Sequence, residues 1–96
     1  MTDGIPELTD DDFTRALPRS VRDRLIRGEI REGKEIAAFR RFAALTQVEF
    51  AKALGVSLHT LRNWEQGRRR PEGPALALLR VAARHPGVLR ENLAVA

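Results

Sequence analysis

The sequence contains no cysteine and no tyrosine, and only 5% of its 96 residues are aromatic. The lack of cysteine excludes a disulfide framework, a thiolate nucleophile and any cysteine-based zinc site. The two histidines, His59 and His85, are too few and too isolated to hold a metal ion, so we expect no metal and no cofactor. Apolar residues make up 43% of the chain, and mostly aliphatic side chains must therefore form its core.

Long apolar segments are also missing. No run approaches the roughly 20 residues that a membrane span needs, and the acidic N-terminus has no apolar segment of the signal-peptide kind. We therefore expect a single cytoplasmic domain without a membrane partner. The sequence offers no nucleophile–base pair, no metal cluster and no glycine-rich phosphate loop, so we expect neither enzymatic activity nor a small-molecule substrate.

Charge is unevenly distributed along the chain. Residues 1–12 contain five acidic residues and no basic one, whereas residues 13–96 contain 17 basic and 8 acidic residues, a net charge of +9. Fifteen of the basic residues are arginine. Such a basic body is typical of proteins that bind a polyanion. A domain with surface arginine and a solvated acidic tail fits the same composition, and charge alone does not separate the two interpretations.

Capping signals and apolar spacing divide the chain into short helices and predict an all-α fold. We expect residues 1–33 to form an N-terminal arm, acidic and then amphipathic, with helices over 10–17 and 19–27. Gly33 is interpreted as the separator between this arm and the domain formed by residues 34–96. Within the domain we expect five helices, over 34–44, from Thr46 to Gly55, and over 58–65, 74–84 and 88–95.

The segment TQVEFAKALGVSLHTLRNWEQG, residues 46–67, carries the most specific pattern. Thr46 followed three residues later by Glu49 predicts a capping box, and Ser57 predicts the cap of a second helix. Gly55 stands where the first helix should end in a left-handed residue. Two short helices joined by such a turn are a helix-turn-helix motif. An ordinary helical hairpin with a polar outer face is the alternative.

The second helix of this motif should present polar side chains outward while Leu61 and Trp64 face the core. Arginine suits guanine, asparagine suits adenine, and leucine can contact a thymine methyl group in the major groove of DNA. The side chains expected on that outer face are Leu58, His59, Arg62 and Asn63.

The stretch LTQVEFAKALGVSLHTLRNWEQGRRRPEGPALALLRVA resembles the Cro/cI-type (XRE) helix-turn-helix family, and within it the HigA-type antitoxins and NadS-like regulators. The resemblance covers about residues 34–84. It implies a five-helix bundle that forms a homodimer and binds operator DNA. In the antitoxin branch it also implies binding and neutralisation of a RelE-like or HigB-like ribonuclease toxin, with autorepression of the operon.

The same resemblance assigns roles to individual residues. The expected DNA contacts are Thr46, Gln47, Ser57, Leu58, His59, Arg62, Asn63, Arg68, Arg69 and Arg70. At Leu58 the chain departs from the polar residue often found in the family, so we expect a methyl contact there or none. A carboxylate near the core needs a cation, and the family pattern predicts an ion pair between Arg40 and Glu65.

Two further surfaces are expected. The acidic start of the arm should screen the basic active site of an RNA-cleaving toxin. The apolar face that follows should bind a hydrophobic groove of the toxin through Phe13, Leu17, Val21, Leu25 and Ile26. The alternative is that residues 19–27 pack on the bundle as an extra helix. The last helix should form the dimer interface through Val88, Leu89, Leu93 and Val95. A stand-alone repressor without a toxin, and an RNA-associated adaptor, are the functional alternatives.

Overall fold

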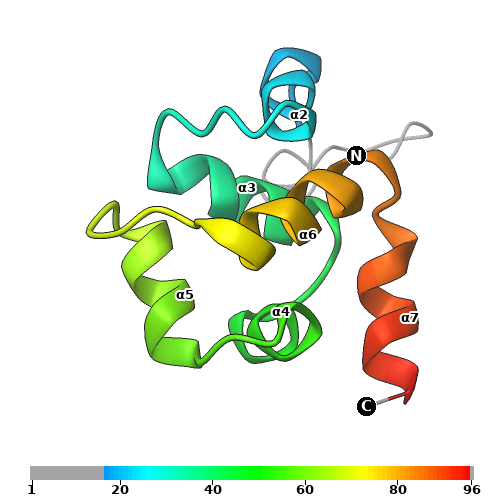
Figure 1. The fold of residues 1–96 in the computed structure, drawn as a ribbon. Coiled ribbons are helices and arrows are strands. Elements are labelled where there is room, and N and C mark those ends of the chain that lie inside the picture. The colour runs from blue at the N-terminus through cyan, green and yellow to red at the C-terminus, as the bar shows by residue number, and fades with distance from the viewer. Residues whose placement is uncertain (1–16, 96) are drawn as a thin grey trace, which may run out of the picture.

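The computed structural model describes residues 17–95, which form six α-helices and no strand (Figure 1). None of the helices in this described range is long and apolar enough to cross a membrane. The helix expected over 10–17, with Phe13, lies outside the described residues. The helices are α2 (Arg19–Ile26), α3 (Gly33–Phe42), α4 (Gln47–Leu54), α5 (Leu58–Glu65), α6 (Gly73–Arg84) and α7 (Gly87–Val95).

The helices α3 to α7 correspond to the five that the sequence predicts, each starting and ending within two residues of its expected bounds. The predicted count of five is nevertheless one short for the packed body, because α2 also belongs to it. Leu25 of α2 is only 2% exposed and shares one core cluster with Ile36 and Leu79. The expected division at residue 33 therefore does not separate two packed bodies, and α2 is the extra helix of the alternative interpretation.

The centre of the fold is aliphatic, with a few aromatic side chains where α3, α4 and α5 meet. The ring of Phe39 meets the ring of Phe50 edge-on, with centroids 6.0 Å apart and planes at 78°. Both side chains are buried, as are Leu61 and Trp64 on the inner face of α5. Such edge-to-face pairs add to the stabilisation that burial provides. The inner face of α5 is therefore held against α3 and α4.

Leu89 of α7 is turned inward, which corrects its assignment to the dimer surface. Its side chain is 1% exposed and belongs to the core, so it is covered within one chain. Val88 and Leu93 are partly buried and pack against the same core. Asn92 adds a hydrogen bond from its side-chain amide to the carbonyl oxygen of Ala53 on α4. Leu89, the most buried residue of α7, is thus used for packing within the chain.

Three arginines stabilise the fold by donating to carbonyl groups at helix ends. Arg22 Nε of α2 donates to Ala83 O of α6 at 2.9 Å, and Arg80 Nε of α6 donates to Ile26 O of α2 at 3.0 Å. Arg90 donates from α7 to the carbonyl just after α3, that of Ala44, at 3.0 Å. Cations are favourable at the negative C-terminal ends of helices. Part of the arginine content therefore serves the fold, and the positive charge of the chain is not all available to a polyanion.

Candidate DNA-binding site

The turn between α4 and α5 has the geometry that the sequence predicts. Gly55 ends α4 in the left-handed conformation, with φ 75° and ψ 27°. A Cβ atom built at this position would meet nothing within 4 Å, so glycine is needed here for its backbone angle and not for space. The amide of Val56 then donates to Ala51 O at 3.0 Å and closes the turn. These two features set the path of the chain from α4 into α5.

Both helices of the motif begin with a side-chain cap. Thr46 Oγ1 accepts from Glu49 N at 3.1 Å, and Glu49 Oε1 accepts from Thr46 N at 2.9 Å, which completes the predicted capping box. Ser57 Oγ accepts from Thr60 N at 3.0 Å and donates to Thr60 Oγ1 at 2.9 Å. The hydroxyl groups of Thr46 and Ser57, both expected to lie at the DNA, are therefore already used in caps.

The outer face of α5 presents polar side chains to solvent. His59 and Arg62 are exposed, while Leu58 and Asn63 are half-buried at its margins. Asn63 Nδ2 and His59 Nε2 lie 3.2 Å apart, one helical turn from each other, and form a pair on this face. The structure thus brings the four expected base-reading residues onto one short helix.

The arginine loop after α5 divides into two parts. The amides of Arg68 and Arg69 both donate to Asn63 O, at 2.9 and 3.3 Å, so the loop continues directly from the end of α5. The side chains of Arg68 and Arg69 are exposed. Arg70 instead turns back, and its Nη1 donates to Ile30 O at 3.0 Å. Among the three expected phosphate contacts, Arg70 is therefore tied to the chain itself.

A polar cluster on the inner side joins α3, α4 and α5. Arg40 Nε donates to Glu65 Oε2 at 2.8 Å, and the two side chains are only 12% and 8% exposed. Arg40 Nη1 also donates to Leu45 O at 3.1 Å, in the connection to α4. The structure thus contains the Arg40–Glu65 pair that the family pattern predicts, and this pair holds the end of α5 to α3.

Gln47 belongs to this cluster as well, which the sequence analysis did not foresee. It was expected at a DNA phosphate, but its side-chain amide Nε2 donates to Glu65 Oε1 at 2.9 Å. The physical reason is the acceptor capacity of a carboxylate, which exceeds what one arginine fills. A carboxylate so well covered requires those partners to offset its lost hydration. Through its bond to Glu65, the last residue of α5, the side chain of Gln47 therefore helps to position that helix.

Gly33 also makes a contact that the sequence analysis did not foresee. As the first residue of α3, it lies against the end of α5 so closely that a Cβ would be 2.2 Å from Trp64 O, 2.7 Å from Glu65 O and 2.8 Å from Gly67 N. Gly33 therefore permits a backbone-to-backbone contact and does not separate an arm from a domain. No local signal distinguishes this use of glycine from a turn, because its partners are 31 to 34 residues further along the chain.

Comparison with known proteins identifies a family and two relatives. Residues 4–92 match the family model described as the antitoxin component of a bacterial toxin–antitoxin system, MqsA. Antitoxin HigA-2 of Vibrio cholerae is 44% identical over 55 residues, covering 57% of this chain and 53% of that protein. The uncharacterized HTH-type transcriptional regulator YazB of Bacillus subtilis is 49% identical over 39 residues, covering 41% of this chain and 56% of that protein.

The chain thus spans about half the length of the curated relatives it matches. No solved structure gave a significant match to it. The resemblance to helix-turn-helix antitoxins, inferred from the motif residues, is confirmed: the family model and HigA-2 bear out the antitoxin part, and YazB bears out the helix-turn-helix part. Because the family model covers nearly the whole sequence, the chain belongs to the MqsA antitoxin family, the antitoxin components of bacterial toxin–antitoxin systems.

Proposed function

We propose that the protein is a sequence-specific DNA-binding repressor and the antitoxin of a type II toxin–antitoxin pair. The observation that carries the DNA-binding part is α5. Its inner face is buried through Leu61 and Trp64, and its last residue is held by Arg40. Its outer face is polar and lies beside an exposed pair of arginines. A rigid helix with a free polar face is what major-groove reading requires.

In this proposal α5 enters the major groove and the loop after it follows the phosphate backbone. Arg62 and Asn63 read base edges, since arginine and asparagine make bidentate contacts with guanine and adenine. Arg68 and Arg69 contact phosphates, which position the protein without reading sequence. The free backbone N–H groups at the starts of α4 and α5 add phosphate contacts.

We also propose a homodimer through α7. Leu89 faces the core, so Val88 and Leu93 remain as the partly buried apolar residues that a second chain would cover. The side chain of Val95 lies outside the described residues. Figure 1 shows α4 between α5 and α7, which leaves α7 free of the proposed DNA surface. Two recognition helices would then reach half-sites about 10–10.5 base pairs apart.

The proposed protein partner is a RelE-like or HigB-like ribonuclease toxin. Family membership supports a toxin in general, and the name of HigA-2 supports this branch. An RNA-cleaving enzyme needs positive charge at its active site, and the first 12 residues of this chain carry five acidic side chains that could screen it. Leu17, Val21 and Ile26 follow this segment in the sequence and are partly buried against the core. Leu25 is excluded from the surface because it lies in the core.

Operator binding tests the DNA-binding role, and random-sequence DNA is the internal control. Arg62→Ala and Asn63→Ala should each weaken operator binding by about 1–3 kcal/mol and random-DNA binding by much less. Arg69→Ala should weaken both alike and reduce the salt slope by about one unit. Equal losses on both DNAs for Arg62→Ala would refute its role as a base reader.

Toxin binding is best tested in the full chain, because removal of α2 would also remove Leu25 from the core. The five acidic residues of positions 1–12 can be changed to their amides, which removes their charge and keeps α2 and Leu25 in the chain. We expect weaker binding to the toxin encoded by the neighbouring gene and unreduced operator binding. Undiminished neutralisation by this variant would overturn the proposed role of the acidic segment.

A stand-alone repressor is the second candidate, since the relative YazB is named a transcriptional regulator only. The two functions differ in one measurement. A stand-alone repressor would bind operator DNA but would form no complex with the product of a neighbouring gene. Co-expression of the two genes followed by size-exclusion chromatography separates the alternatives.

A further inference from the structure

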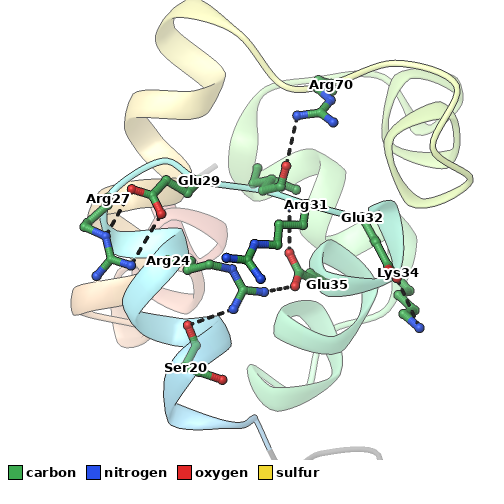
Figure 2. A network of polar contacts seen from close by, with 10 residues as sticks. Ser20, Arg24, Arg27, Glu29, Arg31, Glu32, Lys34, Glu35 and Arg70 are labelled. Atoms are coloured by element: carbon green, nitrogen blue, oxygen red, sulfur yellow. Dashed lines mark hydrogen bonds and ion pairs between the residues drawn. The ribbon is translucent and has the colours of Figure 1, made fainter.

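The connection between α2 and α3, residues 27–32, joins three parts of the fold through polar contacts (Figure 2). Arg24 of α2 forms an ion pair with Glu35 of α3, and both side chains are largely buried. Glu35 Oε1 also accepts from the backbone amide of Arg31 in the connection, at 2.9 Å. Arg70, in the loop after α5, donates to Ile30 O from the other side. The position of α2 is therefore linked to both α3 and this loop.

The link continues into the recognition helix through backbone atoms. Gly33 begins α3 directly after the connection, and it lies against the last residues of α5, Trp64 and Glu65. Side chains can rotate away when a neighbour moves, but closely packed backbones cannot. A displacement of the connection must therefore be passed to the end of α5 or must open this contact.

The docking of α2 depends on its tertiary contacts with the rest of the fold. The helix has only eight residues, too few to be stable by itself in water. Leu25 in the core, with Val21 and Ile26 packed beside it, provides the apolar contacts. Hydrogen bonds with α6 through Arg22 and Arg80, and the Arg24–Glu35 pair, complete the docking. A cavity of about 370 Å³ lies between the connection and the loop after α5, so apolar packing does not fill this junction. Such a segment can open locally while the rest of the fold persists.

From these contacts we propose that docking of α2 controls DNA binding. Docked α2 holds α5 in its operator-reading orientation, so loss of α2 docking lowers operator affinity. This inference rests on the proposed DNA-binding function. By linkage, operator DNA must strengthen α2 docking by the same factor by which α2 docking strengthens operator binding. The connection and the backbone contact of Gly33 carry this coupling between α2 and α5, and surface charge does not.

The test compares two arginines near the end of α2. Arg24→Met breaks the largely buried pair with Glu35, whereas Arg27→Met breaks an exposed pair with Glu29, whose side chains are both 56% exposed. Each substitution removes one positive charge, so nonspecific electrostatics change equally. We expect Arg24→Met to weaken operator binding about 5- to 20-fold, within the usual range for coupled sites, and Arg27→Met to weaken it less than about 2-fold. Random-sequence DNA should not distinguish the two variants.

Two measurements keep the test decisive. If Arg24→Met does not fold, Glu35→Gln breaks the same pair with a smaller change, and Glu29→Gln is its control. In the unmodified protein, operator DNA should slow hydrogen exchange of the α2 amides by a factor similar to the affinity loss. Equal operator affinities for the matched variants, or α2 exchange unaffected by operator DNA, would overturn the coupling. Failure of the unmodified protein to bind any operator would instead refute the proposed function.

Discussion

Gly33→Ala tests the backbone contact on which the placement of α5 depends. The added Cβ would lie 2.2 Å from Trp64 O, whereas ordinary contacts begin at 3.4 Å, so α3 and α5 would have to separate by about 1 Å. The atoms it meets belong to the backbone and cannot rotate aside. Overpacking of this kind costs about 1–3 kcal/mol. We therefore expect a loss of stability and, because α5 must shift, a loss of operator affinity.

Gly87→Ala is a matched control for this substitution. Gly87 is also the first residue of a helix, it also lacks a positive φ, and a Cβ there would meet nothing within 4 Å. Both substitutions raise the free energy of unfolding by about 0.4–1 kcal/mol, because alanine restricts the unfolded chain more than glycine does. The difference between the two variants therefore isolates the overpacking term. In a domain of this size it should amount to roughly 5–20 °C in Tm.

Urea unfolding followed by the fluorescence of Trp64 measures this difference directly. Trp64 is the only tryptophan of the chain, it is buried, and its carbonyl oxygen is the atom nearest to the added Cβ. We expect Gly33→Ala to unfold at lower urea than Gly87→Ala, with an unchanged m-value. If the two variants are equally stable, the close contact does not exist and the proposed coupling loses its backbone step.

Three further predictions concern individual contacts. Arg40→Met should cost about 3–5 kcal/mol in urea unfolding, because it leaves the Glu65 carboxylate buried without its cation; additivity in a double-mutant cycle with Glu65→Leu would contradict the pair. Thr46→Ala should cost about 1 kcal/mol by removing the cap of α4, and a neutral result would contradict that cap. A hydrogen bond from Arg27, and then its charge, lower the pKa of Glu29 from its ordinary 4.5, so stability present above that pH is lost as pH falls through the folded-state pKa. Arg27→Met should raise the NMR titration midpoint of Glu29, and an unchanged midpoint would refute the contact.

The sequence predicts the local parts of the fold well because their causes are local. Caps at Thr46 and Ser57 and the left-handed Gly55 act over three or four residues, so the motif and its helix bounds can be derived from spacing alone. The Arg40–Glu65 pair spans 25 residues, and no spacing rule predicts it. The family pattern supplied that pair, and the need of a covered carboxylate for a cation gives its physical reason.

The contacts that were not foreseen arise where one residue has two plausible uses. Leu25 and Leu89 are apolar residues on short amphipathic helices, and the hydrophobic pattern cannot tell a face that packs within the chain from one that packs on a partner. Gln47 next to a helix cap suits a phosphate as well as a buried carboxylate. Each choice is decided by a tertiary contact, and the sequence pattern contains no information about it.

The net charge of the chain does not show how many of its arginines are available to bind DNA. Arg22 and Arg80 donate to helix ends, Arg24 and Arg40 form covered ion pairs, and all four use their charge inside one chain. A count of basic residues therefore overstates the surface available to DNA. The exposed arginines beside α5 are few, so we expect operator binding to have a modest salt slope, near one unit for each phosphate contacted. In the proposed DNA-binding function, sequence reading by α5 must then supply much of the preference for an operator over random DNA. That division of roles makes the orientation of α5, and hence the contacts of Gly33, Gln47 and Glu65 behind it, the feature on which specificity depends.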